Sequence, residues 1–121
     1  MKYLKILFVG LLLATLFITG CAKCDGEQPR ARVVNNGTER VNIQIQTSEG
    51  NTVNINNVEP NTTSDWKNYA AGEIKFTISV DDNGGVHSDQ ILNVTMQDCW
   101  EYDIIIDSNN NVSSEPSDRN E

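Results

Sequence analysis

Three cysteines and one histidine are the residues of this 121-residue chain that are best suited to chemistry. Cys21 directly follows a long apolar run, Cys24 lies three residues later, and Cys99 is near the C-terminus. Two distant cysteines and one histidine do not supply the ligand spacing that zinc needs. His87 lies beside Asp89 in a Gly-rich stretch, without a nucleophile at the spacing a triad requires. We therefore expect no catalytic residues, no metal site and no cofactor, and a protein that is not an enzyme.

The N-terminal segment has the order of a secretory leader. Lys2 and Lys5 precede a nearly continuous apolar stretch over residues 6–19, which is the pattern of a secretory signal. A stretch this short does not span a bilayer comfortably. It ends in the sequence ITGC, whose last residue is Cys21. The pattern predicts export of the chain.

The ITGC sequence resembles the lipobox of bacterial lipoproteins, in which a peptidase cuts before the cysteine and the thiol carries a diacylglycerol. The resemblance implies a signal peptide over residues 1–20 and acyl chains on Cys21, and two or more such chains anchor a protein stably. We therefore expect the membrane as one partner and the bacterial cell envelope as the location. Ala22 after the cysteine resembles the signal for outer-membrane sorting. The alternative is an ordinary secretory signal with Cys21 left as a thiol.

Cys24 and Cys99 are the cysteines that remain once Cys21 carries lipid. Exported chains meet oxidising conditions, so we expect these two thiols to form a disulfide. Closing so long a loop stabilises a fold by about 4 kcal/mol in the chain-entropy model. The alternatives are two free thiols or a disulfide between two chains.

The charge balance excludes one class of partner. Without residues 1–20, seven Lys or Arg stand against 17 Asp or Glu, a net charge of −10. Nucleic acid requires clustered basic residues, so we expect no nucleic-acid partner. Acidic loops at residues 81–89 and 107–118 carry oxygen ligands of the kind calcium prefers, but the second lacks the glycine and glutamate of an EF-hand. Solvated loops are the preferred interpretation, with calcium as the alternative.

The mature chain reads as short strands separated by turns. Three runs alternate between apolar and polar residues, which is the period of a strand with one buried face, and four weaker runs lie between them. Turn signals rich in Asn, Gly and Pro separate the runs roughly every 10 residues. These features predict an all-β, small antiparallel sandwich of about seven strands. The strong runs are 41–46, 74–81 and 100–107, and the weaker ones are 31–34, 52–58, 64–69 and 90–96.

The two ends of the mature chain look unstructured. Residues 21–29 form a short polar tether, and residues 108–121 contain one aliphatic residue, too few to offset the entropy of ordering. We expect a lipidated tether, one domain over residues 30–107, and a disordered polar tail over 108–121.

Four aromatic residues could form either a sugar-stacking platform or part of the core. Trp100 and Tyr102 share a strand face with Ile104, so we expect them in the core. Trp66 and Tyr69 would lie on opposite faces of a strand, which would leave one of them exposed.

Three segments of the core follow a recognisable succession: ARVVNNGTERVNIQI, TSDWKNYAAGEIKFTISV and CWEYDIIID. In this succession the core resembles a family of uncharacterised bacterial lipoprotein domains with a transthyretin-like or immunoglobulin-like sandwich. Trp66 stands where the family more often has tyrosine, and Cys99-Trp100 where it often has a glycine turn. The family has no established activity, so the resemblance implies the fold alone.

The same resemblance orients the domain. In immunoglobulin-like sandwiches the first strand can lie parallel to the last, which would bring Cys24 and Cys99 to one end. Loops 35–40, 59–63 and 81–89 would then share the opposite end, and loops are where binding residues usually lie on a rigid scaffold. The alternative is that these loops are merely solvated turns. The candidate partner-binding residues are Arg40, Asp81, Asp82, His87 and Asp89.

We therefore expect a lipid-anchored binding or structural module of the envelope, without catalysis, whose partner is an envelope protein or a glycan. It could be one component of a larger assembly. The alternative is an envelope-anchored inhibitor or immunity protein, since such proteins are often small, acidic and disulfide-linked. An enzyme would require a deep pocket in which His87 meets acidic partners.

Overall fold

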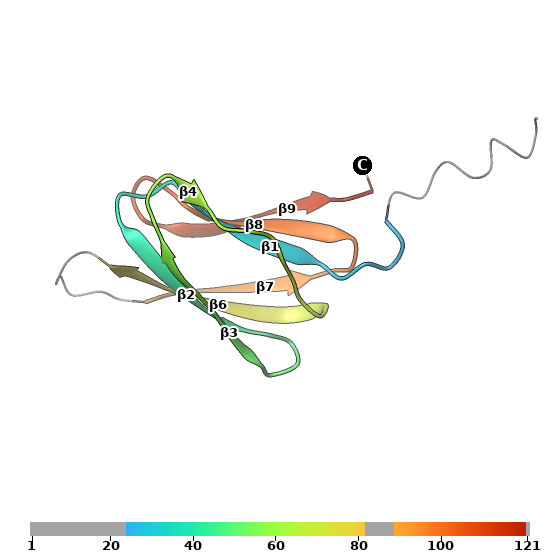
Figure 1. Ribbon diagram of the computed structural model, residues 1–121. Coiled ribbons are helices and arrows are strands. Elements are labelled where there is room, and N and C mark those ends of the chain that lie inside the picture. Colours follow the sequence, from blue (N-terminus) through green and yellow to red (C-terminus); the bar gives the residue numbers. More distant parts are fainter. Residues whose placement is uncertain (1–23, 82–88, 121) are drawn as a thin grey trace, which may run out of the picture.

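The computed structural model of the chain describes residues 24–81 and 89–120 (Figure 1). Two sheets pack face to face, so the predicted all-β sandwich is confirmed, with nine strands in place of about seven. The described residues contain no helix that could cross a membrane. The strands are β1 (Arg30–Asn35), β2 (Arg40–Gln46), β3 (Thr52–Val58), β4 (Thr62–Thr63), β5 (Lys67–Asn68), β6 (Gly72–Asp81), β7 (Gln90–Met96), β8 (Trp100–Ile106) and β9 (Val112–Asp118).

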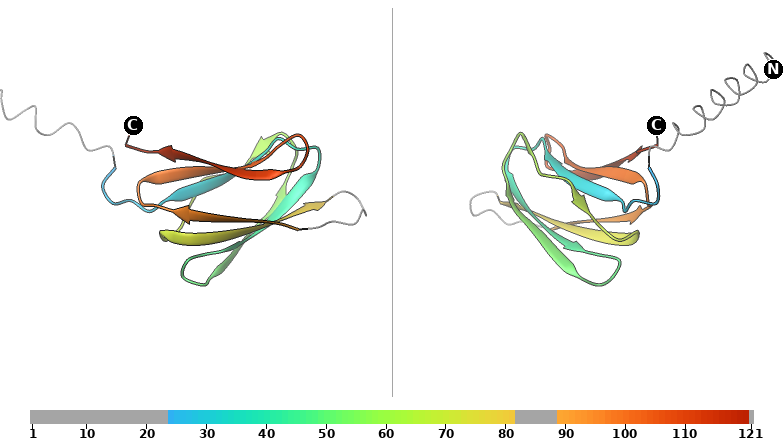
Figure 2. Two further views of the ribbon diagram at one scale, coloured as in Figure 1. Left: turned by 180° about the vertical axis from the view of Figure 1, so that it is seen from behind. Right: turned by 45° about the vertical axis from the view of Figure 1, so that its right-hand side comes forward.

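The strand order combines antiparallel neighbours with one parallel pair. One sheet has the order β3-β2-β6-β7, and all its neighbours are antiparallel. The other has the order β4-β1-β8-β9, and β5 also pairs with β1. β1 runs parallel to β8, with Ala31 opposite Tyr102. This confirms the expected parallel approach of the first run to the run from Trp100. The two layers are visible in both views of Figure 2.

The core lies between the layers and follows the alternation in the sequence. In β2, β6 and β8 every second residue is buried along most of the strand, as a strand with one apolar face requires. Phe76 is the largest fully buried side chain. Tyr102 is buried, and Trp100 packs against the core while partly buried, which confirms the core role expected of both.

The run predicted as a strand over residues 64–69 is wrong in its bounds. β4 and β5 are two-residue strands that pair with opposite ends of β1. Between them Trp66 leaves the ladder and lies against two guanidinium groups, with the Cζ atoms of Arg30 and Arg32 at 4.6 and 4.4 Å from its ring centroid. Tyr69 enters the core, and because β4 and β5 both pair with β1, this segment runs along the edge of the five-stranded sheet.

The prediction of a disordered tail over residues 108–121 is also wrong. Residues 112–118 form β9, which pairs with β8 along its whole length. The Asp107 carboxylate accepts two backbone N–H groups at 2.9 Å each and thereby shapes the turn before β9. Backbone hydrogen bonds to β8 therefore order this segment, although it has few apolar side chains to bury. Pro116 is compatible with this placement because edge strands tolerate a missing donor.

Candidate functional site

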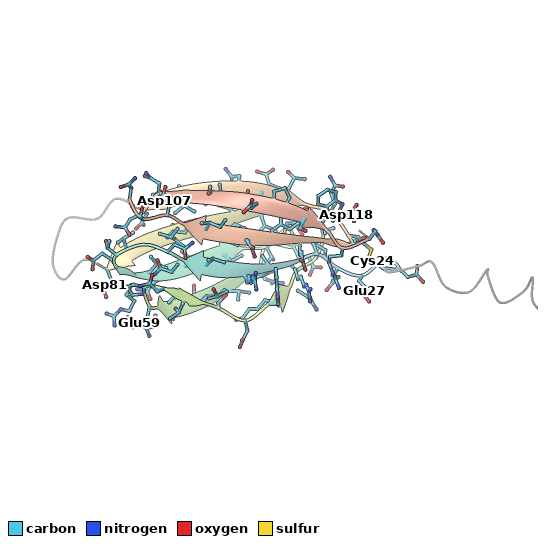
Figure 3. All side chains as sticks on the ribbon, turned by 90° about the horizontal axis from the view of Figure 1, so that it is seen from above. Cys24, Glu27, Glu59, Asp81, Asp107 and Asp118 are labelled. Atoms are coloured by element: carbon cyan, nitrogen blue, oxygen red, sulfur yellow. A yellow bond between two sulfur atoms is a disulfide. The ribbon has the colours of Figure 1, made fainter. Side chains whose placement is uncertain are left out.

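The connections between strands gather at two ends of the sandwich (Figure 3). One end contains Cys24 and Glu27, and we call it the disulfide end. The other contains Glu59, Asp81 and Asp107, and we call it the loop end. The predicted separation of the cysteines from the candidate binding loops is therefore confirmed for the described residues.

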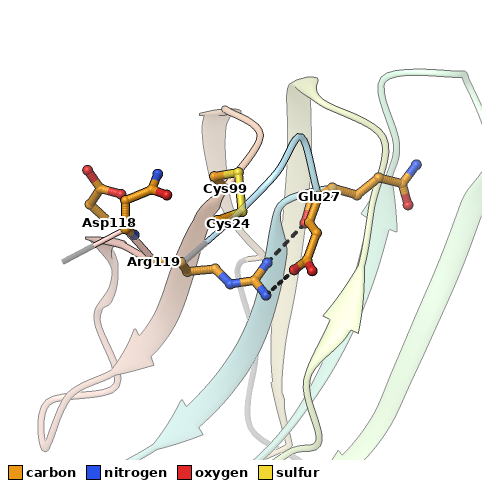
Figure 4. Close-up of a disulfide and its surroundings, with 7 residues drawn as sticks. Cys24, Glu27, Cys99, Asp118 and Arg119 are labelled. Carbon is orange, nitrogen blue, oxygen red and sulfur yellow. Dashed lines mark hydrogen bonds and ion pairs between the residues drawn. A yellow bond between two sulfur atoms is a disulfide. The ribbon is translucent and has the colours of Figure 1, made fainter. Parts of the chain in front are cut away.

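The disulfide end is built on the bond between Cys24 and Cys99, whose Cα atoms are 5.8 Å apart. The predicted intramolecular disulfide is thus confirmed (Figure 4). Cys99 has a φ of 65°, which lies in the left-handed region that glycine adopts most easily. Its N–H donates to the carbonyl of Glu27 at 2.8 Å. The bond and this hydrogen bond hold the start of the domain against the turn before β8.

Arg119, which directly follows β9, binds to residues of the disulfide end (Figure 4). Its backbone N–H donates to the carbonyl of Cys99 at 3.0 Å, and its Nη2 donates to the carboxylate of Glu27 at 2.6 Å. The carbonyl of Pro29 accepts the N–H of Tyr69 at 3.0 Å. The expectation of an unstructured tether over residues 21–29 is therefore corrected, because the chain belongs to the folded domain from Cys24 onward.

The loop end places three charged groups together. Arg40 and Asp81 are opposite each other in the register of β2 and β6. The Nε of Arg40 donates to the Asp81 carboxylate at 3.0 Å, and its Nη1 is 3.9 Å from the carboxylate of Glu59. The hydrogen bond and charge of Asp81 raise the pKa of Arg40 above its ordinary value. Glu59 was missed as an individual residue, although the loop that contains it was predicted to lie at this end.

The remaining predicted residues are not all described. Asp89 accepts a hydrogen bond from the Ser79 hydroxyl at 2.7 Å, near the C-terminal end of β6. Asp82 and His87 lie outside the described residues, as does the lipidation candidate Cys21. Of the candidate binding residues, the structure thus brings Arg40 and Asp81 into direct contact and places Asp89 directly before β7, hydrogen-bonded to β6 of the same sheet.

A buried asparagine, which sequence analysis did not single out, braces the loop end. Asn35 is fully buried, and its amide nitrogen donates to the carbonyls of Glu39 and Val58 at 2.8 and 2.9 Å. Its oxygen accepts the N–H of Gly37 at 3.0 Å. The Asn-Asn-Gly sequence signals a turn, but the burial of Asn35 depends on strands distant in the chain. This network fixes two loops relative to each other beside Arg40.

The chemistry available at this end is that of polar recognition. A hollow of about 330 Å³ on the outer face of the sheet is bordered by Asp89 and by the side chains of Asn42, Gln44 and Asn54. Amides, hydroxyls and carboxylates of this kind bind a polar partner through hydrogen bonds and charge. In the part of the chain that the structure describes, no group of three or more His, Cys, Asp or Glu residues could hold a metal ion.

Tyr69 is the described residue whose buried side-chain oxygen lacks a hydrogen-bond partner. Its side chain is buried in the core, and this burial raises its pKa to about 12. The unfolded chain loses the phenolic proton near pH 10, whereas the folded chain retains it up to about pH 12. The stabilisation from this group is therefore complete below pH 10 and is lost between pH 10 and 12.

We expect the wild-type free energy of unfolding to fall by about 2–3 kcal/mol relative to Tyr69→Phe between pH 9 and 12. Denaturant unfolding of both proteins at several pH values measures this difference, and the variant is its own control for every other alkaline group. Two curves that stay parallel across this range would show that the Tyr69 hydroxyl titrates normally.

Comparisons with known proteins add little to this geometry. No protein-family model matches the chain, and the search of curated proteins found no match. Among solved structures, the NMR structure of a protein from Eubacterium rectale is similar, with 18% identity over 76% of this chain and 90% of that one, and a TM-score of 0.47. We transfer nothing from a likeness at this level.

Proposed function

We propose that this protein is a lipid-anchored binding module of the bacterial cell envelope, held at the outer membrane by acyl chains on Cys21. The leader and its ITGC ending support the anchor by their resemblance to a lipobox. Cys24 is three residues after Cys21, a reach of roughly 10 Å in extended chain. The acyl chains therefore hold the disulfide end close to the bilayer.

The observation that carries the proposal is the placement of the disulfide and the loops at opposite ends of the sandwich (Figure 3). An anchor beside Cys24 turns the loop end away from the membrane. Arg40, Glu59 and Asp81 then face the envelope space or the exterior, where a protein or glycan partner can reach them. Asp89, directly before β7, adds a further carboxylate to this surface.

Affinity capture from an envelope extract, with the lipidated protein as bait, tests this function. The variant Arg40→Gln/Glu59→Gln/Asp81→Asn removes all three charges at the loop end. We expect it to lose a partner that the wild-type protein captures, because the polar contacts at that end are removed.

A matched control removes an ion pair of the same chemistry elsewhere. Arg30 and Glu101 pair at 2.7 Å between β1 and β8, near the disulfide end, so Arg30→Gln/Glu101→Gln should capture as the wild type does. Equal capture by the wild type and the loop-end variant would contradict the proposed surface.

A further inference from the structure

β3 is an open edge of the four-stranded sheet in the described structure. The N–H of Thr47 donates to the carbonyl of Asn51 at 2.8 Å in the hairpin that joins β2 to β3. Hydrogen-bonded pairs alternate along an antiparallel ladder, so the backbone groups of Val53 and Ile55 face β2. Those of residues 52, 54 and 56 face away from the sheet and have no strand to pair with.

Two of the other edges, β9 and β7, are better protected than β3. Natural edge strands carry charges or proline that prevent unwanted pairing, and β9 contains Glu115 and Pro116. β7 is tied to the start of β9, because the Gln90 side chain donates to the carbonyl of Asn110 at 2.6 Å and accepts the N–H of Val112 at 3.1 Å. β3 has neither a charged residue nor a proline over its whole length.

A groove runs beside this edge. Two hollows of about 320 and 270 Å³ lie between β3 with its hairpin and residues 62–70, which contain β4 and β5, and Lys67 borders both. Ile55 lines the first and Val53 the second, and both are only partly buried. Tyr69, 5% exposed and with an unpartnered hydroxyl, also lines the second. The groove thus offers half-covered apolar groups next to free backbone donors and acceptors.

We propose that β3 binds an extended segment of a partner polypeptide as an added antiparallel strand, with apolar residues at alternate positions and at least one basic residue. The alternate residues would cover Val53 and Ile55, and the backbone would pair with the outward groups of β3. A chain with a mature net charge of −10 repels its own copies, whereas a basic segment complements it. Asp65 borders the first hollow and Glu49 the second, so each hollow has a carboxylate that a basic residue can pair with.

This inference rests on the proposed function as a binding module and names the class of its partner. β3 ends at Val58, immediately before Glu59 of the loop end, so one partner can cover both surfaces. Pairing at β3 does not require acyl chains on Cys21 or the charges of the loop end. The two proposals can therefore fail separately.

The probe is a synthetic peptide with the sequence of residues 40–46, RVNIQIQ, acetylated and amidated at its ends. This sequence already pairs antiparallel with β3 on its other side, and Arg40 gives it one positive charge. Hydrogen exchange of the full chain in detergent, followed by mass spectrometry, measures protection. With peptide at ten times its dissociation constant, we expect exchange to slow about tenfold in β3.

Two controls separate strand pairing from other binding. The same peptide with every backbone amide N-methylated has no N–H donor on either edge, so it cannot form the ladder and should give no protection. Asn54→Pro removes an outward N–H at an edge, where proline is tolerated, and should weaken peptide binding at least about tenfold. Asn54→Ala retains the N–H and should bind as the wild type does. If Asn54→Pro does not fold, the methylated peptide still provides the comparison.

Three results would overturn the proposal. One is no protection of β3 at saturating peptide, and another is equal protection by the methylated peptide. The third is a concentration-dependent dimer, seen by sedimentation without peptide and abolished by Asn54→Pro, which would assign this edge to a second copy of the chain. The two experiments can also give different answers. If the loop-end variant loses envelope capture but the peptide does not protect β3, the proposed function stands and this inference is wrong.

Discussion

Replacing Cys21 with serine should move the protein from the membrane fraction to the soluble fraction of the envelope. Each buried methylene contributes about 0.8 kcal/mol to membrane binding, so stable anchoring requires two or more acyl chains. Serine provides no thiol to carry them. The described domain has no other apolar anchor of that kind, since Ile91 is its one large hydrophobic side chain that is strongly exposed. Cell fractionation followed by immunoblotting measures the distribution.

The control for this experiment is the double variant Cys24→Ala/Cys99→Ala, which keeps Cys21 and removes the disulfide. It should remain in the membrane fraction. A Cys21→Ser protein that also stays there would show that the anchor is not on this residue.

The same double variant is expected to lower the free energy of unfolding by about 4 kcal/mol in the chain-entropy model. The bond joins residues separated by 75 positions, so its loss frees most of the domain in the unfolded state. The effect is large for a domain of this size, whose total stability is about 5–15 kcal/mol. Urea unfolding of the wild-type and variant proteins measures the difference.

Reduction of the wild-type protein should reproduce this loss, which separates the effect of the bond from that of the alanine side chains. A difference below about 1 kcal/mol, well under the range typical of native disulfides, would show that the strand pairing alone holds the two ends together.

The strands with the strongest alternation could be predicted because each carries its own burial pattern. Val41, Ile43 and Ile45 are all inside, and their polar neighbours are not. β9 lacks such a pattern, and its order comes from pairing with β8 and from the contacts of Arg119 with Glu27 and Cys99. Those partners lie far away in the sequence, so composition alone predicted disorder.

For the loop end, the sequence predicts that the loops lie together but not which residues contact each other there. Strand direction brings its loops together, but the contact between Arg40 and Asp81 depends on the register of β2 and β6. The bracing role of Asn35 depends on carbonyls from two other segments. Likewise the open edge of β3 follows from the order of strands in the sheet, which local sequence does not specify.

The most direct test of the central claim is the orientation of the domain on a membrane. The lipidated chain is reconstituted in vesicles whose headgroups carry a quencher, with a fluorescent amino acid introduced at Asp98 or at Asn109. Both residues are exposed, and they flank β8 at its two ends, which at about 3.3 Å per residue places them roughly 20 Å apart or more. An anchor beside the disulfide predicts strong quenching at Asp98 and weak quenching at Asn109. Equal quenching at the two positions, or stronger quenching at Asn109, would contradict the proposed orientation.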